Sequence, residues 1–397
     1  MGRGREGRRH QDRVKIARVA ATPLNVPIRL DAAGIEKQTS LSVCLVEVET
    51  GDGLIGHGFT AITEEEVVAA AINQVAAADL IGEDPLAHEK IWEKLYWLMS
   101  PRGQTGYASH AIAALDVALW DLKGKFFNQP VFRLLGGARS SVPVYTTFGF
   151  GAYSRDELAA AAKWWVGRGH RKLKMVVGHH GLQRRDEPRP LDEVIAEDLR
   201  RVRAVRDAVG MEVDLHVDAN CSLDSFHAAR LARSLEELQI SFFEEPVRDN
   251  DIPALLSLRQ FTRLPIAAGQ NEGLAWRFRD LMVSRAVDIV QPNVVIGGGF
   301  TQCVRIAGMA SAFNLPMANG GAWAHHNQHL HAGLANGGLV EYHYPAVKVC
   351  EAIYGPLPAP VDGWLELPEK PGLGFSPDPL LVKELARLPT SHGKGKA

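Results

Sequence analysis

The chain has 397 residues, of which 46% are apolar, and a formal net charge of -2. This length suits one large domain with a smaller one, and the near-neutral charge predicts neither a nucleic-acid nor a membrane partner. No apolar stretch approaches the roughly 18 residues of a membrane-spanning helix, and four cysteines without metal-type spacing indicate a reduced, cytoplasmic protein.

The N-terminal part of the chain divides into an extension and a small domain. Residues 1–13 are basic and lack the apolar segment of a secretory signal, so we expect a disordered extension, with a functional basic tail as the alternative. Residues 14–137 indicate an α+β domain. Alternating segments at 41–50 and 51–60 flank a Gly-Asp-Gly turn, which predicts a hairpin, and residues 108–125 predict a long helix.

A regular alternation of strand and helix patterns follows. The short apolar runs lie at 142–148, 171–177, 211–217, 239–243, 264–268, 287–290, 315–318 and 338–343. Eight strand–helix repeats predict an α/β fold, a (β/α)8-type TIM barrel over residues 138–365. A doubly wound sheet is the alternative, but the segment VVIGGGF lacks the glycine spacing of a dinucleotide-binding loop. We expect residues 366–397 to pack back on the N-terminal domain.

Polar residues follow the ends of the predicted strands, where barrel enzymes place their chemistry. These residues are Lys172 and Lys174; Asp218 and Asn220; Glu244 and Glu245; Gln270 and Glu272; Asn293; Asn319; Glu341 and His343. A single acid after a strand is commonly a helix cap. However, Asp218, Glu244 and Gln270 follow one another at equal intervals of 26 residues (218 to 244, 244 to 270). Converging carboxylates need a counter-charge, and Mg2+ prefers such oxygen ligands.

Several of these segments together resemble the enolase superfamily, specifically its mandelate racemase subgroup (the mandelate racemase/muconate lactonizing enzyme family). They are KLK (172–174), VDAN (217–220), FEEP (243–246), GLGF (372–375) and the helical segment 111–137. The resemblance covers nearly the whole chain after the extension. It implies a modified TIM barrel with an N-terminal α+β capping domain, and a symmetric homo-oligomer.

The resemblance also implies a base and a metal. Lys174 matches the lysine that removes the proton α to a carboxylate, and Lys172 beside it is expected to lower its pKa. One Mg2+ per subunit is implied, with Asp218 and Glu244 as ligands and Glu245 in support. The third ligand position holds Gln270 where the family has Glu. Because Mg2+ favours carboxylates, we favour Glu272, two residues further on, and keep Gln270 as the alternative.

The general acid is harder to assign. Racemase-like members pair an Asp after the sixth strand with a His after the seventh. Asn293 stands at the Asp position and Gly320 near the His position, so this His–Asp dyad is absent. A cluster follows, made of His325, His326, His329 and His331. We expect His325 or His326 to protonate a leaving hydroxyl, as the similar acid-sugar dehydratases do. A zinc pair at His325 and His329, or plain surface histidines, are the alternatives.

The remaining candidates are substrate contacts. They are Asn220, Asn293, Asn319, Glu341 and Lys37. Lys37 lies in 27–40, which corresponds to a mobile loop of the family. The long polar loop 178–190 carries His179, Arg184 and Arg185, which either meet a distal part of the substrate or are solvated.

Together these features predict a Mg2+-dependent lyase that dehydrates an acid sugar (an aldonate or aldarate) to a 2-keto-3-deoxy acid. A racemase or epimerase on the same scaffold is the first alternative, and Asn293 argues against it. A non-catalytic binding relative is the second alternative, and the retained lysines and metal acids argue against it.

Overall fold

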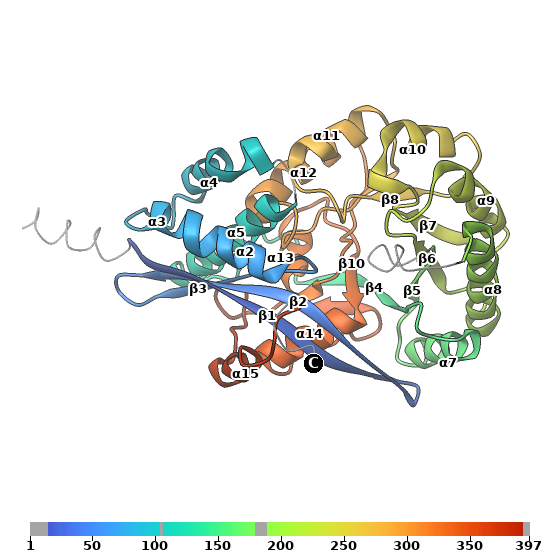
Figure 1. The fold of residues 1–397 in the computed structure, drawn as a ribbon, viewed down its shortest axis with the longest axis horizontal. Coiled ribbons are helices and arrows are strands. Elements are labelled where there is room, and N and C mark those ends of the chain that lie inside the picture. Colours follow the sequence, from blue (N-terminus) through green and yellow to red (C-terminus); the bar gives the residue numbers. More distant parts are fainter. Residues whose placement is uncertain (1–14, 104–105, 179–188, 392–397) are drawn as a thin grey trace, which may run out of the picture.

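The structure is a computed structural model that describes residues 15–103, 106–178 and 189–391. The predicted extension at 1–13 and the loop residues His179, Arg184 and Arg185 lie outside the described residues. Figure 1 shows a long antiparallel sheet on one side of the molecule and a ring of strands and helices on the other.

The sheet of the capping domain contains β1 (Ile16–Ala32), β2 (Ile35–Thr50) and β3 (Ile55–Ala61), paired in that order. The predicted hairpin between β2 and β3 is confirmed. Residues 27–40, which correspond to a mobile loop of the family, form the end of the β1–β2 hairpin here, because the two strands stay paired down to Ala32 and Ile35. Alternate residues of this part of β1 are buried, which is the pattern of a strand with one packed face.

The predicted helix at 108–125 is confirmed as α5 (Tyr107–Phe126). It is buried on nearly all sides because β3 packs on one face and α12 on another. Gly58 of β3 permits this approach, since a Cβ there would lie 1.8 Å from the carbonyl oxygen of Ala114. The other helices of this part are α2 (Glu65–Ala70), a π-helical turn (Ala71–Ala76), α3 (Ala77–Leu80), α4 (His88–Gly103) and α6 (Val131–Leu134).

The predicted barrel is present in a modified form. Its parallel strands run in the order β10, β4, β5, β6, β7, β8 and β9, and β11 pairs antiparallel with β4. Their bounds are β4 (Ser141–Gly149), β5 (Lys172–Val176), β6 (Asp214–Asp218), β7 (Ile240–Glu244), β8 (Ile266–Ala268), β9 (Ile289–Val290), β10 (Val340–His343) and β11 (Trp364–Glu366). The strand expected at 315–318 is reduced to two bridges, Val290 to Met317 and Ala318 to Leu339, which connect β9 with β10 and complete the ring.

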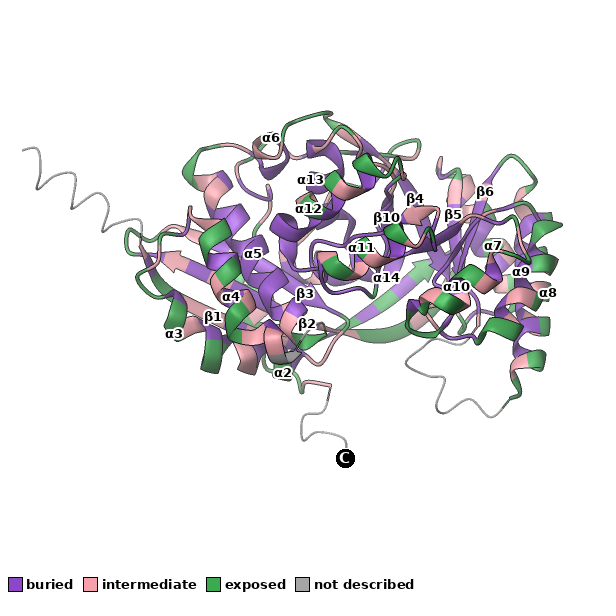
Figure 2. Ribbon diagram, turned by 90° about the horizontal axis from the view of Figure 1, so that it is seen from above, coloured by how far each residue is buried: buried purple, intermediate pink, exposed green. Residues whose placement is uncertain are grey.

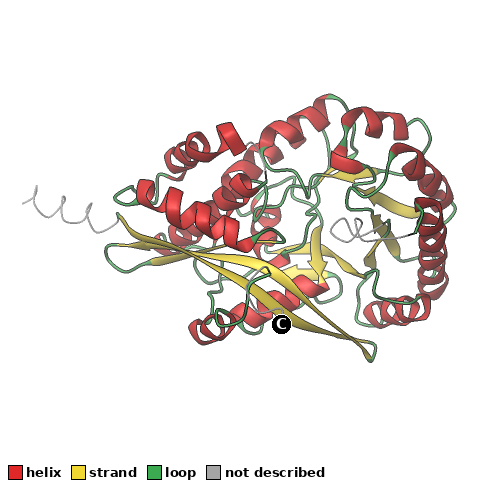
Figure 3. Cartoon of the chain, viewed as in Figure 1, coloured by secondary structure: helices red, strands yellow, loops and turns green. Residues whose placement is uncertain are grey.

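Helices surround this ring (Figure 3). They are α7 (Arg155–Val166), α8 (Leu191–Val209), α9 (Ser225–Glu236), a 3-10 turn (Arg248–Asn250), α10 (Ile252–Leu258), α11 (Ala275–Val283), α12 (Gly299–Ala312), α13 (Ala324–Gly333), α14 (Tyr344–Tyr354) and α15 (Pro379–Leu385). None of the described helices is long and apolar enough to span a membrane.

The two domains share one packed core. Buried residues of β1, β2 and α5 join those of the barrel in a single hydrophobic cluster, and Figure 2 shows α5 and the barrel strands buried while the outer helices keep exposed faces. Hydrogen bonds reinforce the contact, because Thr301 at the start of α12 donates from its backbone N–H to Asp116 of α5 at 3.0 Å. Near the C-terminus, the N–H of Leu373 donates to Asp121 at 2.8 Å. The position of the capping domain over the barrel is therefore fixed.

Candidate active site

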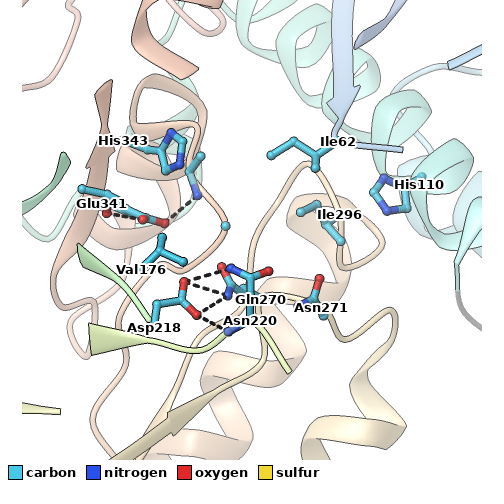
Figure 4. Close-up of a pocket in the computed structure, with 13 residues that line it drawn as sticks. Ile62, His110, Val176, Asp218, Asn220, Gln270, Asn271, Ile296, Glu341 and His343 are labelled. Carbon is cyan, nitrogen blue, oxygen red and sulfur yellow. Dashed lines mark hydrogen bonds between the residues drawn. The ribbon is translucent and has the colours of Figure 1, made fainter. Parts of the chain in front are cut away.

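A cavity lies where the carboxyl ends of the barrel strands face the capping domain. Its titratable lining residues are Asp218 of β6, Glu341 and His343 of β10, and His110 of α5. Figure 4 shows Asp218 and Glu341 on the barrel side, and His110 with Ile62 on the side of the capping domain. Residues from distant parts of the chain thus meet at the mouth of the barrel, as expected for this fold.

Lys174 forms the centre of a buried charge cluster beside this cavity. Its Nζ atom lies 3.1 Å from Asp218 Oδ2, 2.8 Å from Glu244 Oε2 and 2.9 Å from Glu341 Oε1. Burial alone lowers the pKa of Lys174, but the three carboxylates outweigh it and raise the pKa well above the ordinary value. This direction is opposite to the lowering expected from Lys172.

Lys172 does not join the cluster. It begins β5, pairs in register with Asp214 at the start of β6, and its ammonium group contacts the Asp214 carboxylate. Both side chains are partly exposed, and they lie at the first residues of β5 and β6, opposite the strand ends that line the cavity. The side chains of Lys172 and Lys174 share a face of β5, as predicted, but two residues of strand separate them along the barrel axis. At the level of Asp218, β5 presents Val176, which lines the cavity.

The structure places Gln270, rather than Glu272, at the cavity. The amide nitrogen of Gln270 lies 3.1 Å from Asp218 Oδ2 and 3.1 Å from Glu245 Oε2. Glu272 instead pairs with Arg277 at 2.9 Å. The same-face argument for Glu272 fails because β8 ends at Ala268, so the period of two no longer applies.

The carboxylates of Asp218 and Glu244 fit a hard divalent cation, and the Gln270 amide, whose nitrogen faces Asp218, would present its oxygen to such a cation after rotation of the amide. Glu244 Oε1 is buried and has no hydrogen-bond partner among the described residues. Burial and the neighbouring charge of Asp218 raise the pKa of Glu244 well above its ordinary value, which favours an added positive charge. Within the described chain no cluster of three or more His, Cys, Asp or Glu is arranged to hold a metal. The third donor here is an amide, and an amide oxygen also suits Mg2+.

The histidines of α13 do not reach the mouth, contrary to the prediction for His325 and His326. The ring of His325 bonds through Nε2 to the carbonyl of Pro358 at 2.8 Å. His326 stacks on Phe59 of the capping domain, with ring centroids 4.8 Å apart. Neither residue lines the cavity. The buried helix α13 turns these side chains toward neighbouring backbone and the capping domain.

His329 and His331 have structural partners as well. His329 accepts a hydrogen bond from the N–H of Phe132, and its Nε2 lies 3.1 Å from the carbonyl of Leu373. His331 accepts from the N–H of Gly338 at 3.0 Å. Both are fully buried, so the surface alternative is wrong. Because the rings of His325 and His329 each contact a separate backbone carbonyl, the geometry does not favour a zinc pair.

Three of the predicted substrate contacts lie away from the cavity. Asn293 donates to the carbonyl of Gly320 at 2.7 Å and so holds the loop after the seventh strand position. Asn319 accepts from the N–H of Glu341 at 3.1 Å. Lys37 pairs with Glu157 of α7 at 2.9 Å. By contrast, Asn220 and Glu341 do line the cavity.

The sequence reasoning missed His110 as a site residue and noted His343 only as a strand-end residue. His110 is the single histidine of α5 and directly precedes its apolar run 111–115, which was the available signal. His343 ends β10 and caps α14, and its neighbour Glu341 is held by Thr147 and by the N–H of Ala322 at 2.7 Å.

Two family profiles match the chain. Residues 13–136 match the N-terminal domain of the mandelate racemase/muconate lactonizing enzyme family, and residues 157–381 match the enolase C-terminal domain-like family. The chain belongs to the mandelate racemase/muconate lactonizing enzyme family. Its modified barrel and α+β capping domain are those of the enolase superfamily.

Members of this family with known activities are similar over most of the chain. Arabinonate dehydratase of Saccharolobus solfataricus is 30% identical, over 85% of this chain and 88% of the relative. The 3,6-anhydro-alpha-L-galactonate cycloisomerase of Streptomyces coelicolor is 29% identical, over 91% of this chain and 96% of the relative. The crystal structure of L-talarate dehydratase from Polaromonas sp. JS666, complexed with Mg and L-glucarate, has a TM-score of 0.79, with 31% identity over 94% of this chain and 98% of that chain. The similar family members thus include lyases and isomerases of acid sugars.

Proposed function

We propose that this protein is a Mg2+-dependent lyase that dehydrates an aldonate or aldarate to a 2-keto-3-deoxy acid. The observation that carries the proposal is the pair of carboxylates at the ends of β6 and β7, Asp218 and Glu244, with the Gln270 amide two residues after β8, beside a polar cavity. Relatives that dehydrate arabinonate, talarate and galactarate support the substrate class.

In this proposal Asp218, Glu244 and the amide oxygen of Gln270 hold the cation. When bound, Mg2+ supplies positive charge that holds a substrate carboxylate and acidifies the neighbouring C–H bond. Lys174 fixes the orientation of both metal carboxylates through its ion pairs. Asn220 and Asn271 present amide groups to the cavity, and such groups suit the hydroxyls of a sugar acid.

The test is proton NMR in D2O with Mg2+ and a panel of mono- and di-acid sugars. Loss of the α-proton signal together with a new C3 methylene or CHD signal is expected for one or more panel members. Deuterium at Cα with an unchanged carbon skeleton would instead establish an epimerase. No change with any sugar acid would overturn the proposed function and favour a binding protein.

A further inference from the structure

The proposed dehydration needs a group that accepts a proton, and most titratable side chains of the cavity already make hydrogen bonds or ion pairs. Asp218 accepts hydrogen bonds from the backbone and side chain of Asn220 and pairs with Lys174. Glu341 accepts from Thr147 and Ala322, in addition to its contact with Lys174. The two histidines are different, since among the described residues neither His110 nor His343 has a hydrogen bond at Nε2.

The hydrogen bonds of His110 fix its tautomer. The Thr60 hydroxyl lies 2.6 Å from the carbonyl oxygen of Val295, which only accepts, so the hydroxyl proton is used there. Thr60 Oγ1 also lies 2.7 Å from His110 Nδ1, so that contact requires a proton on Nδ1. The neutral ring therefore carries its lone pair on Nε2. Burial lowers the pKa of His110 to about 4, so the ring is neutral near pH 7.

His343 has the opposite tautomer. Its Nδ1 accepts from the N–H of Ala346 at 3.3 Å, as the N-cap of α14. A backbone N–H only donates, so Nδ1 is unprotonated and the proton of the neutral ring sits on Nε2. The cavity therefore has a proton acceptor on its capping-domain side and a hydrogen-bond donor on its barrel side, which Figure 4 shows on opposite sides.

We propose that His110 Nε2 removes the substrate α-proton, and that the Nε2–H of His343 donates a hydrogen bond to a substrate oxygen. This assignment rests on the proposed dehydration. The Cα–H bond breaks, its proton goes to His110, and its electron pair forms the double bond to the carboxylate carbon. The electron pair of that double bond then shifts to form Cα=Cβ and the carboxylate is restored, while the Cβ–O bond breaks with its electron pair on oxygen; His110 returns the proton to that oxygen, which leaves as water. The enol that remains tautomerises to the 2-keto acid, and His110 is again neutral.

The test compares two asparagine variants whose fold-related hydrogen bonds are kept. In His110→Asn the amide nitrogen replaces Nδ1 and still reaches Thr60, but nothing replaces Nε2. In His343→Asn the amide oxygen still caps α14, but the Nε2–H donor is lost. We expect kcat of His110→Asn to fall about 10²- to 10⁴-fold and its α-proton exchange in D2O to fall with it. We expect KM of His343→Asn to rise about tenfold with kcat nearly unchanged.

His88→Asn is the control, because this capping-domain histidine contacts Lys123 away from the cavity, and it should keep wild-type kinetics. If His110→Asn folds poorly, His110→Ala with added imidazole replaces it, and partial recovery of turnover is expected. Wild-type turnover combined with near-normal exchange in the His110 variants would overturn the assignment alone. Wild-type silence on every sugar acid would overturn the proposed function, and the assignment with it.

Discussion

The barrel side of the cavity holds a lysine in contact with three carboxylates, whereas the capping-domain side contributes His110 and Ile62 and, within the described residues, brings no charged group to the lining. The barrel side arises from a repeated unit, so equal sequence spacing brings its acids to one level. The capping-domain side arises from the packing of α5 against β3 and the barrel. The positions of the charged residues thus follow from the repeat of the barrel strands, whereas the position of His110, the proposed proton acceptor, follows from contact between the two domains.

The largest expected effect concerns Lys174 on the barrel side of the cavity, compared with Lys172 at the start of β5. Lys174→Met should lower the free energy of unfolding by about 3–5 kcal/mol, because it leaves three buried carboxylates without their counter-charge. Lys172→Met is the matched control. Its partner Asp214 is about half exposed, so we expect a loss of no more than about 1 kcal/mol. Urea denaturation in EDTA measures both. An equal loss of unfolding free energy in the two variants would contradict the assignment of a buried charge cluster to Lys174 and a partly exposed ion pair to Lys172.

An intermediate effect concerns the third metal ligand. Gln270→Glu should raise the affinity for Mg2+ about tenfold or more, because it adds a carboxylate to Asp218 and Glu244. Glu272→Gln should leave the affinity unchanged, because Glu272 pairs with Arg277 outside the cavity. Isothermal titration calorimetry with MgCl2 measures both. A large loss of affinity in Glu272→Gln would restore Glu272 as the ligand.

The smallest expected effect tests the capping-domain side. Thr60→Val keeps the shape of the side chain but removes the hydroxyl that accepts from His110 Nδ1. We expect kcat to fall about tenfold, the cost of one hydrogen bond. The 15N NMR signals of His110 should change from one tautomer to a mixture. Thr39→Val on the exposed part of β2 is the control. An unchanged tautomer in Thr60→Val would show that the hydroxyl does not position the ring.

Much of the fold and part of the site could be predicted from the sequence. The strand–helix alternation identified seven barrel strands within a few residues, and the spacing of strand ends pointed to Asp218 and Gln270, which line the cavity, and to Glu244, which contacts Lys174. Predictions based only on the two-residue period of a strand failed where the strand ends or where distance along the strand matters. The prediction of Glu272 as a metal ligand assumed that β8 continues, but this strand ends at Ala268. The prediction that Lys172 acts beside Lys174 considered only the face of the strand that they share, and not the distance between them along β5.

Other residues depended on tertiary contacts that no local pattern encodes. His325 and His326 follow the seventh strand position, but the burial of α13 turns them toward Pro358 and Phe59. His110 lies far from any strand end, and it enters the cavity only because α5 packs beside the barrel. Its tautomer depends on Thr60 and Val295, which are 235 residues apart in the chain.

That hydrogen bond between Thr60 and Val295 joins the capping domain to the barrel. If the domains separated, the Thr60 hydroxyl would lose its acceptor and could donate to His110 Nδ1 instead, which would move the ring proton to Nε2 and occupy the reactive lone pair. The Nδ1–H form of the ring, on which the proposed role of His110 depends, is therefore set by a contact between the two domains.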